Sequence, residues 1–255
     1  MKWESMEIRR NLMSRKMFAG LVLCFLCLLY GGMDHLDMPA TNFLDVFIFA
    51  QTDGTTCIIA ILFPLLAVLP AGTAYRSERQ QGYYALVCQK MGFMRYCRMK
   101  LWNSVLCGAL VLGIPHLLFY FVCILSRTGQ EMTGQNVSIS FLPRVYEQYP
   151  VMYGIILVAN SALCGAVFSI LGLGISAWVT NKYIAAFLPF AYYVFSGVVL
   201  IEIHPAWNAI TLFSLNQYAK ADMTAVLAYD SLLLGAGIFL FFTGVDHDDQ
   251  IPFFT

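Results

Sequence analysis

The chain has 255 residues, of which 59% are hydrophobic and 12% are charged, and its formal net charge at pH 7 is zero. Water-soluble domains carry roughly a quarter of their residues as charged side chains, so this composition excludes an ordinary soluble globular protein and predicts an integral membrane protein. Zero net charge by itself identifies no partner, so the position of each charge along the chain is the more informative property.

Six apolar runs approach the roughly 20 residues that a membrane-spanning helix needs. They cover residues 17–32, 57–75, 101–125, 151–179, 184–201 and 225–245. The first run is short, but the basic side chains of Arg15 and Lys16 can reach the headgroups and extend it, and tilt can absorb the length of the fourth. We therefore expect residues 1–255 to form one all-helical transmembrane domain with six spans.

Lys and Arg are distributed unevenly between the segments that connect these runs. Five precede the first run, six lie in residues 76–100 and one is Lys182, against Arg127, Arg144 and Lys220 on the alternate side. The positive-inside rule then predicts a multi-pass protein of the cell membrane with both termini and residues 76–100 in the cytoplasm. Because topology explains this asymmetry, nucleic-acid binding is not expected.

The motifs of common enzymes are missing from the sequence. It contains no GxxxxGK[ST] loop, no HExxH and no GxSxG, so we expect no catalytic residues and no bound nucleotide or metal on this chain itself. The eight cysteines lie mostly inside apolar runs, where free thiols act as small packing residues. The redox-like spacing of Cys24 and Cys27 is more simply explained by this packing.

The basic segment 76–100 has the pattern of two short helices. Tyr83, Leu86 and Val87 fall at positions i, i+3 and i+4 and give the first helix an apolar ridge, and Gly92 ends it before a second helix leads into the third span. Two interpretations fit this pattern. Amphipathic helices can lie on the inner leaflet and bind anionic lipids, or the first helix can be a docking element for a cytoplasmic protein.

The stretch "ERQQGYYALVCQKMGFMRYCRMKL" resembles the first cytoplasmic loop of the type 2 ATP-binding-cassette (ABC) transporter permeases. Glu78, Arg79, Gly82, Leu86 and Lys100 occupy the positions at which that family has its acidic, basic, glycine, leucine and final basic residues. Tyr83 stands where the family often has Thr, and "QKMG" replaces a Pro near the turn. The start "WESMEIRRNLMSRK" is similar to the family's amphipathic interfacial N-terminal helix, and residues 202–224 are similar to its outer segment.

This resemblance implies a permease subunit that pairs with a second permease, identical or homologous, and with two cytoplasmic ATP-binding subunits that hold ATP and Mg²⁺. The loop between the second and third spans would be the coupling helix. Its expected contact residues are Glu78, Arg79, Gly82, Tyr83, Leu86 and Val87. The resemblance favours an exporter, and spans rich in aromatic residues favour an amphipathic or hydrophobic cargo such as a peptide, an antimicrobial or a lipid.

Polar residues inside the apolar runs are candidates for a translocation pathway. His116 and Asn160 are the two candidates, since an ionisable or polar group in a span is costly and often functional. A neutral His116 that bridges to a neighbouring helix is the simpler interpretation. Asp230 is expected near the outer headgroups.

Small residues occur in the fourth run in two sets of four-residue spacing, 161–169 and 172–176, and predict close helix packing. They are Ser161, Gly165, Ser169, Gly172 and Ser176. Both a seam between two permeases and packing within one subunit fit this stripe.

Two other classes of protein remain as alternatives. One is an ATPase-independent secondary carrier or substrate-binding membrane subunit, which more often shows ionisable residues in matched halves. The other is a noncatalytic scaffold or sensor, or a membrane enzyme with an unfamiliar site.

Overall fold

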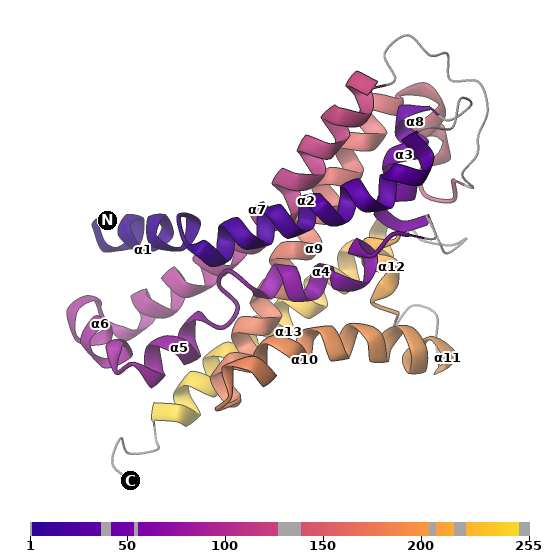
Figure 1. The fold of residues 1–255 in the computed structure, drawn as a ribbon. Helices are drawn as coiled ribbons and strands as arrows, with labels where there is room; N and C mark the ends of the chain where they lie inside the picture. Colours follow the sequence, from indigo (N-terminus) through magenta and orange to yellow (C-terminus); the bar gives the residue numbers. More distant parts are fainter. Residues whose placement is uncertain are drawn as a thin grey trace.

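The computed structural model describes residues 2–36, 42–53, 56–126, 139–203, 208–216 and 223–249. In these ranges all regular secondary structure is helical. The helices run back and forth along one elongated bundle, and the start of α1 (Lys2–Leu12) lies at the same end as the end of α13 (Met223–Asp249) (Figure 1).

Five of the described helices are long and apolar enough to cross a membrane. They are α2 (Arg15–Leu36), α7 (Phe93–Ser126), α9 (Pro150–Trp178), α13, and α10 (Lys182–Phe195) with its π-helical continuation η2 (Ser196–Leu200). Large apolar side chains on their outer faces are exposed, including Leu26 at 53%, Phe121 at 53% and Phe239 at 67%. Such faces suit contact with lipid chains, so the fold indicates a multi-pass protein embedded in a membrane.

The expected continuous span over residues 57–75 does not form. Its helix, α4 (Ile59–Val68), has ten residues and is therefore about 15 Å long, half the thickness of a hydrocarbon core. A turn follows, because Pro70 has no amide hydrogen to continue the helical bonds. The chain then enters α5 (Ala74–Gln80) and reaches the end of the bundle where α1 lies (Figure 1).

The segment before α4 folds into the bundle instead of forming an outer loop. It consists of α3 (Phe43–Ile48) and a π-helical turn, η1 (Phe49–Asp53). Asn42 caps α3 by accepting a 2.7 Å hydrogen bond from the Asp45 amide, and Leu44 and Phe47 are fully buried. This element therefore contributes to the core of the bundle.

Helix α9 is the centre of the fold and packs most extensively against α7 and α13. The opposite end of the bundle carries α8 (Pro143–Gln148), α11 (Ile201–Ile203) and α12 (Ile210–Phe213). The end with α1, α5, α6 (Tyr83–Met91) and the start of α7 carries most of the Lys and Arg residues, and we call it the basic end.

Candidate functional site at the basic end

A cluster of four charged side chains joins α1, α5 and α7 at the basic end. Lys100 Nζ donates to Glu7 Oε1 at 2.5 Å and to Glu78 Oε1 at 2.6 Å. Arg10 Nη2 bridges the same two oxygens at 2.8 Å and 2.6 Å. Tyr96 donates its hydroxyl to the second Glu78 oxygen at 2.9 Å. Two carboxylates are thus held between two cations, and the cluster is neutral as a whole.

The cluster is mostly removed from water. Glu7, Glu78 and Lys100 are 7%, 6% and 1% exposed, whereas the Arg10 side chain is half-exposed. Burial alone would lower the pKa of Arg10, but the charges of Glu7 and Glu78 outweigh it and raise that pKa above its usual value. Buried charges persist only when they are paired and hydrogen-bonded, so each member of the cluster depends on the others.

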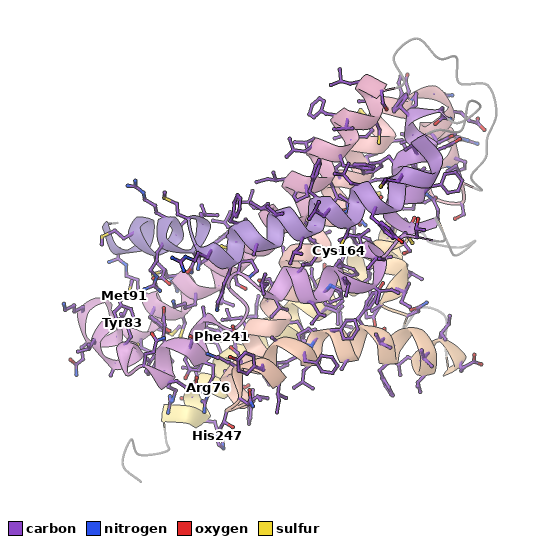
Figure 2. The ribbon with its side chains drawn as sticks, viewed as in Figure 1. Arg76, Tyr83, Met91, Cys164, Phe241 and His247 are labelled. Atoms are coloured by element: carbon purple, nitrogen blue, oxygen red, sulfur yellow. The ribbon has the colours of Figure 1, made fainter. Side chains whose placement is uncertain are left out.

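Helix α6 is attached to the bundle by a series of aromatic rings. Tyr84 of α6 packs edge-on between Tyr75 of α5, at 5.6 Å between ring centroids, and Tyr96 of α7, at 5.3 Å. Tyr75 in turn packs edge-on against Phe241 of α13 at 5.7 Å. Figure 2 shows Tyr83 and Met91 of α6 at the same end of the molecule as Phe241, with Cys164 deeper in the bundle. The hairpin formed by α5 and α6 is therefore packed against two long helices, α7 and α13.

Two glycines delimit α6 and fix its shape. Gly82 precedes the helix with φ +70° and Gly92 follows it with φ +84°, and these left-handed backbones favour glycine over residues with a Cβ. The turn into α6 and the turn out of it are therefore both set by local sequence.

The six predicted coupling residues occupy different environments. Glu78 belongs to the buried cluster, and Arg79 donates to the Tyr75 hydroxyl at 3.1 Å. Tyr83 is partly exposed beneath the Arg10 guanidinium, whose carbon lies 5.5 Å from the ring centroid, and Val87 is buried. Gly82 and Leu86 are exposed, Leu86 at 59%. The structure therefore gives Glu78 an internal role and leaves Gly82 and Leu86 accessible to a partner.

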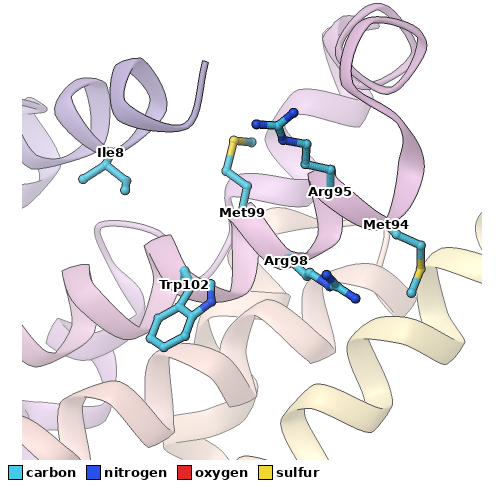
Figure 3. A pocket seen from close by; sticks show the side chains of 6 residues that line it. All are labelled: Ile8, Met94, Arg95, Arg98, Met99 and Trp102. Carbon is cyan, nitrogen blue, oxygen red and sulfur yellow. The ribbon is translucent and has the colours of Figure 1, made fainter. Parts of the chain in front are cut away.

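A groove of about 620 Å³ lies beside the cluster, between α1 and the first turns of α7. Ile8 lines it from α1, and Arg95, Arg98, Met99 and Trp102 are among the α7 side chains that face it (Figure 3). Guanidinium groups next to an indole and apolar side chains can bind a phosphate while covering an acyl chain. The groove thus has the chemistry of a lipid headgroup contact.

The two pathway candidates differ in burial and in contacts, since His116 lies in the interior and Asn160 is partly exposed. His116 is fully buried, with Nδ1 2.8 Å from the Leu112 carbonyl and the ring edge-on to Phe47 and Phe213. Its Nε2 has no hydrogen-bond partner in the described part of the chain. Asn160 donates to the Leu212 carbonyl at 2.8 Å. His116 is thus bonded within its own helix, and Asn160 anchors the segment that contains α12.

The small residues of α9 pack within this chain. Gly165 crosses Gly108 of α7 so closely that a Cβ on either glycine would lie 2.2 to 2.3 Å from the other's carbonyl oxygen. Ser169 and Ser104 of α7 share a 2.8 Å hydrogen bond. The other three residues also have partners in this chain: Gln51 for Ser161, Val68 for Gly172 and the Leu173 carbonyl for Ser176. Packing against other segments of this chain therefore accounts for Ser161, Gly165, Ser169 and Gly172, whereas Ser176 bonds within α9.

A second polar network, which sequence reasoning did not identify, lies at the opposite end. Tyr146 of α8 donates to Asp45 Oδ1 of α3 at 2.7 Å and accepts from Asn42 at 3.2 Å. Burial raises the pKa of Tyr146 to about 12, so the phenol remains a donor at neutral pH. The signal in the sequence was an Asp inside the apolar run "FLDVFIFA", which predicts a buried acid that needs a partner.

Removing this phenol is expected to destabilise the opposite end. Tyr146→Phe takes a donor away from Asp45, which is fully buried, and should lower the free energy of unfolding by about 1–3 kcal/mol. Thermal unfolding in lipid nanodiscs measures this change. Tyr149→Phe is the control because Tyr149 is 64% exposed, and an equal effect of both substitutions would contradict the role of the bond.

Geometry and composition together define a helical, multi-pass membrane protein. No protein-family model matches the chain, and no curated protein matches its sequence. In the described ranges no three His, Cys, Asp or Glu side chains are grouped closely enough to hold a metal ion.

Proposed function

We propose that this chain is the permease subunit of an ATP-driven transporter of the type 2 ABC class, and that an ATP-hydrolysing subunit docks on α6. The observation that carries the proposal is the hairpin of α5 and α6. The buried ion cluster and the aromatic rings fix it to α1, α7 and α13, while Gly82 and Leu86 face outward. A short exposed helix on rigid supports can transmit an applied displacement to long helices.

The proposed orientation places the basic end in the cytoplasm. The excess of Lys and Arg at this end supports it, since cytoplasmic segments carry that excess. Both described ends of the chain then lie on the side where ATP is available (Figure 1). Lipid phosphates of the inner leaflet would occupy the groove of Arg95 and Arg98.

Two ATP-binding subunits carrying ATP and Mg²⁺ and a second permease, identical or homologous, complete the proposed transporter. Closure of the ATP-binding subunits would move α6, and the bundle would alternate between inward and outward access. The proposed cargo is an amphipathic or hydrophobic compound that is exported, because the described interior is rich in aromatic rings and offers few charges.

A substitution on α6 tests the docking. In Leu86→Ser, the affinity of the permease for the ATP-hydrolysing subunit should fall about thirtyfold or more, because apolar anchors contribute about 2 kcal/mol or more to an interface. The measurements are the ATPase activity of the purified complex and the amount of ATP-hydrolysing subunit bound per permease. Thermal unfolding of the permease should not change, since Leu86 is 59% exposed.

Leu125→Ser is the matched control, because Leu125 is 74% exposed at the far end of α7 from the hairpin. It should leave co-purification unchanged. Transport that persists in purified permease without any ATP-binding subunit would contradict the proposal and favour the secondary carrier.

A further inference from the structure

A pocket of about 220 Å³ opens between α9 and α13 near the opposite end of the bundle. Ile156, Ala159 and Leu163 form its α9 wall, and Met223, Val226 and Leu227 form its α13 wall. Among the lining residues only Asn160 carries a polar side chain. The pocket is therefore shaped for the apolar part of a small molecule.

Asp230 lies on the same face of α13 as this wall, one turn further along the helix. Residues 223, 226, 227 and 230 follow the i, i+3, i+4, i+7 spacing of one helical face. Across the interface, Cys164 lies one turn beyond Asn160 on α9, and both Cys164 and Asp230 are buried. Asp230 does not itself line the pocket, but it lies one turn beyond the α13 residues that do.

The Asp230 carboxyl is buried without a partner in the described part of the chain. The residue is 3% exposed, and neither Oδ1 nor Oδ2 has a hydrogen-bond partner there. It lies within the first turns of α13, and its expected place near the outer headgroups stays a prediction. A buried carboxylate is strongly unfavourable unless a cation pairs with it, and even the neutral acid has unmet hydrogen bonds.

We propose that the pocket between α9 and α13 binds a cationic amphiphile, whose apolar chain occupies the cavity and whose ammonium group pairs with Asp230. A bare metal ion suits the site poorly, because one carboxylate offers too few ligands and the lining is apolar. Val226 and Leu227 separate the pocket from Asp230 along α13, so the ammonium group would have to displace one of these side chains to reach the carboxylate. This inference deepens the proposed function by naming the class of cargo. The role of the bound ligand as cargo rests on that proposed function.

The experiment measures binding to the isolated chain, so that it needs no ATP-binding subunit. Octylammonium and octanol have the same apolar chain and differ in charge. Calorimetric titration in nanodiscs, corrected with empty nanodiscs, should show octylammonium binding about thirtyfold or more tighter than octanol. Asp230→Asn should remove this preference and leave octanol binding unchanged. Asp246→Asn, which removes an exposed carboxylate of the same helix, should keep it.

Equal binding of octanol and octylammonium to the unaltered protein would overturn the inference, and that result does not depend on how any variant folds. Full octylammonium preference in Asp230→Asn would overturn it as well. Because these measurements exclude the ATPase, either outcome would leave docking on α6 intact, and a failure of docking would leave this binding site intact.

Discussion

Replacing Lys100 by methionine is expected to lower the free energy of unfolding by about 3–5 kcal/mol, the range found when one member of a buried charge cluster is removed. Lys100 is 1% exposed and contacts both Glu7 and Glu78. Without it, one half-exposed Arg10 must balance two buried carboxylates. The expected consequence is that α1 and the hairpin detach from α7 before the rest of the bundle unfolds.

Thermal unfolding monitored with a thiol-reactive dye measures this change, because the thiols of Cys24 and Cys107 are buried and react once the bundle opens. Arg98→Met is the matched control: it removes an exposed cation of the same helix and should change stability by less than about 0.5 kcal/mol. Combining Lys100→Met with Glu78→Gln restores neutrality, so the double variant should be more stable than the sum of the two single effects predicts. Additive effects would show that the cluster does not act as a unit.

Substitution of Gly165 by alanine is the second change with a large expected effect. The added Cβ would lie 2.2 Å from the Gly108 carbonyl oxygen, and because that oxygen belongs to a helix backbone it cannot rotate away. Helices α7 and α9 must separate, which is expected to cost about 1–3 kcal/mol or more. Gly108→Ala should have a comparable effect, since its Cβ would lie 2.3 Å from the Gly165 oxygen.

Gly235→Ala is the control for this pair. A Cβ at Gly235 meets no atom within 4 Å, so the change should be neutral or should stabilise α13 by up to about 1 kcal/mol through helix propensity. The measurement is the unfolding temperature of Gly165→Ala, Gly108→Ala and Gly235→Ala in nanodiscs, each compared with that of the unaltered protein. Similar values for Gly165→Ala and Gly235→Ala would show that the crossing of α7 and α9 is looser than described.

Long spans could be predicted from the sequence because hydrocarbon imposes a simple requirement. A helix such as α9 or α13 needs enough consecutive apolar residues to satisfy its own backbone, and this requirement is local. The short α4 could not be predicted in the same way. Its apolar run was long enough, but the helix stops before Pro70, and α3 with η1 adds a second short buried segment before it.

The candidate site was also predicted only in part, because local sequence fixes its turns but not its contacts between distant segments. Turn glycines at 82 and 92 fix α6 locally, and the helix forms between them. The pairing of Glu78 with Glu7, Arg10 and Lys100 joins residues up to 93 positions apart, so no local pattern specifies it.

The sequence by itself determined that this chain is helical, that its long spans lie in a membrane and that its cations gather at one end, because each of these properties depends on composition within a short window. Tertiary structure alone decided which polar residues are exposed and which are buried. It enclosed Glu78 in an ion cluster, left Leu86 at the surface and buried Asp230 where none of the described residues is its hydrogen-bond partner. The burial of a residue depends on which other segments cover it, and packing across the whole bundle sets the positions of those segments.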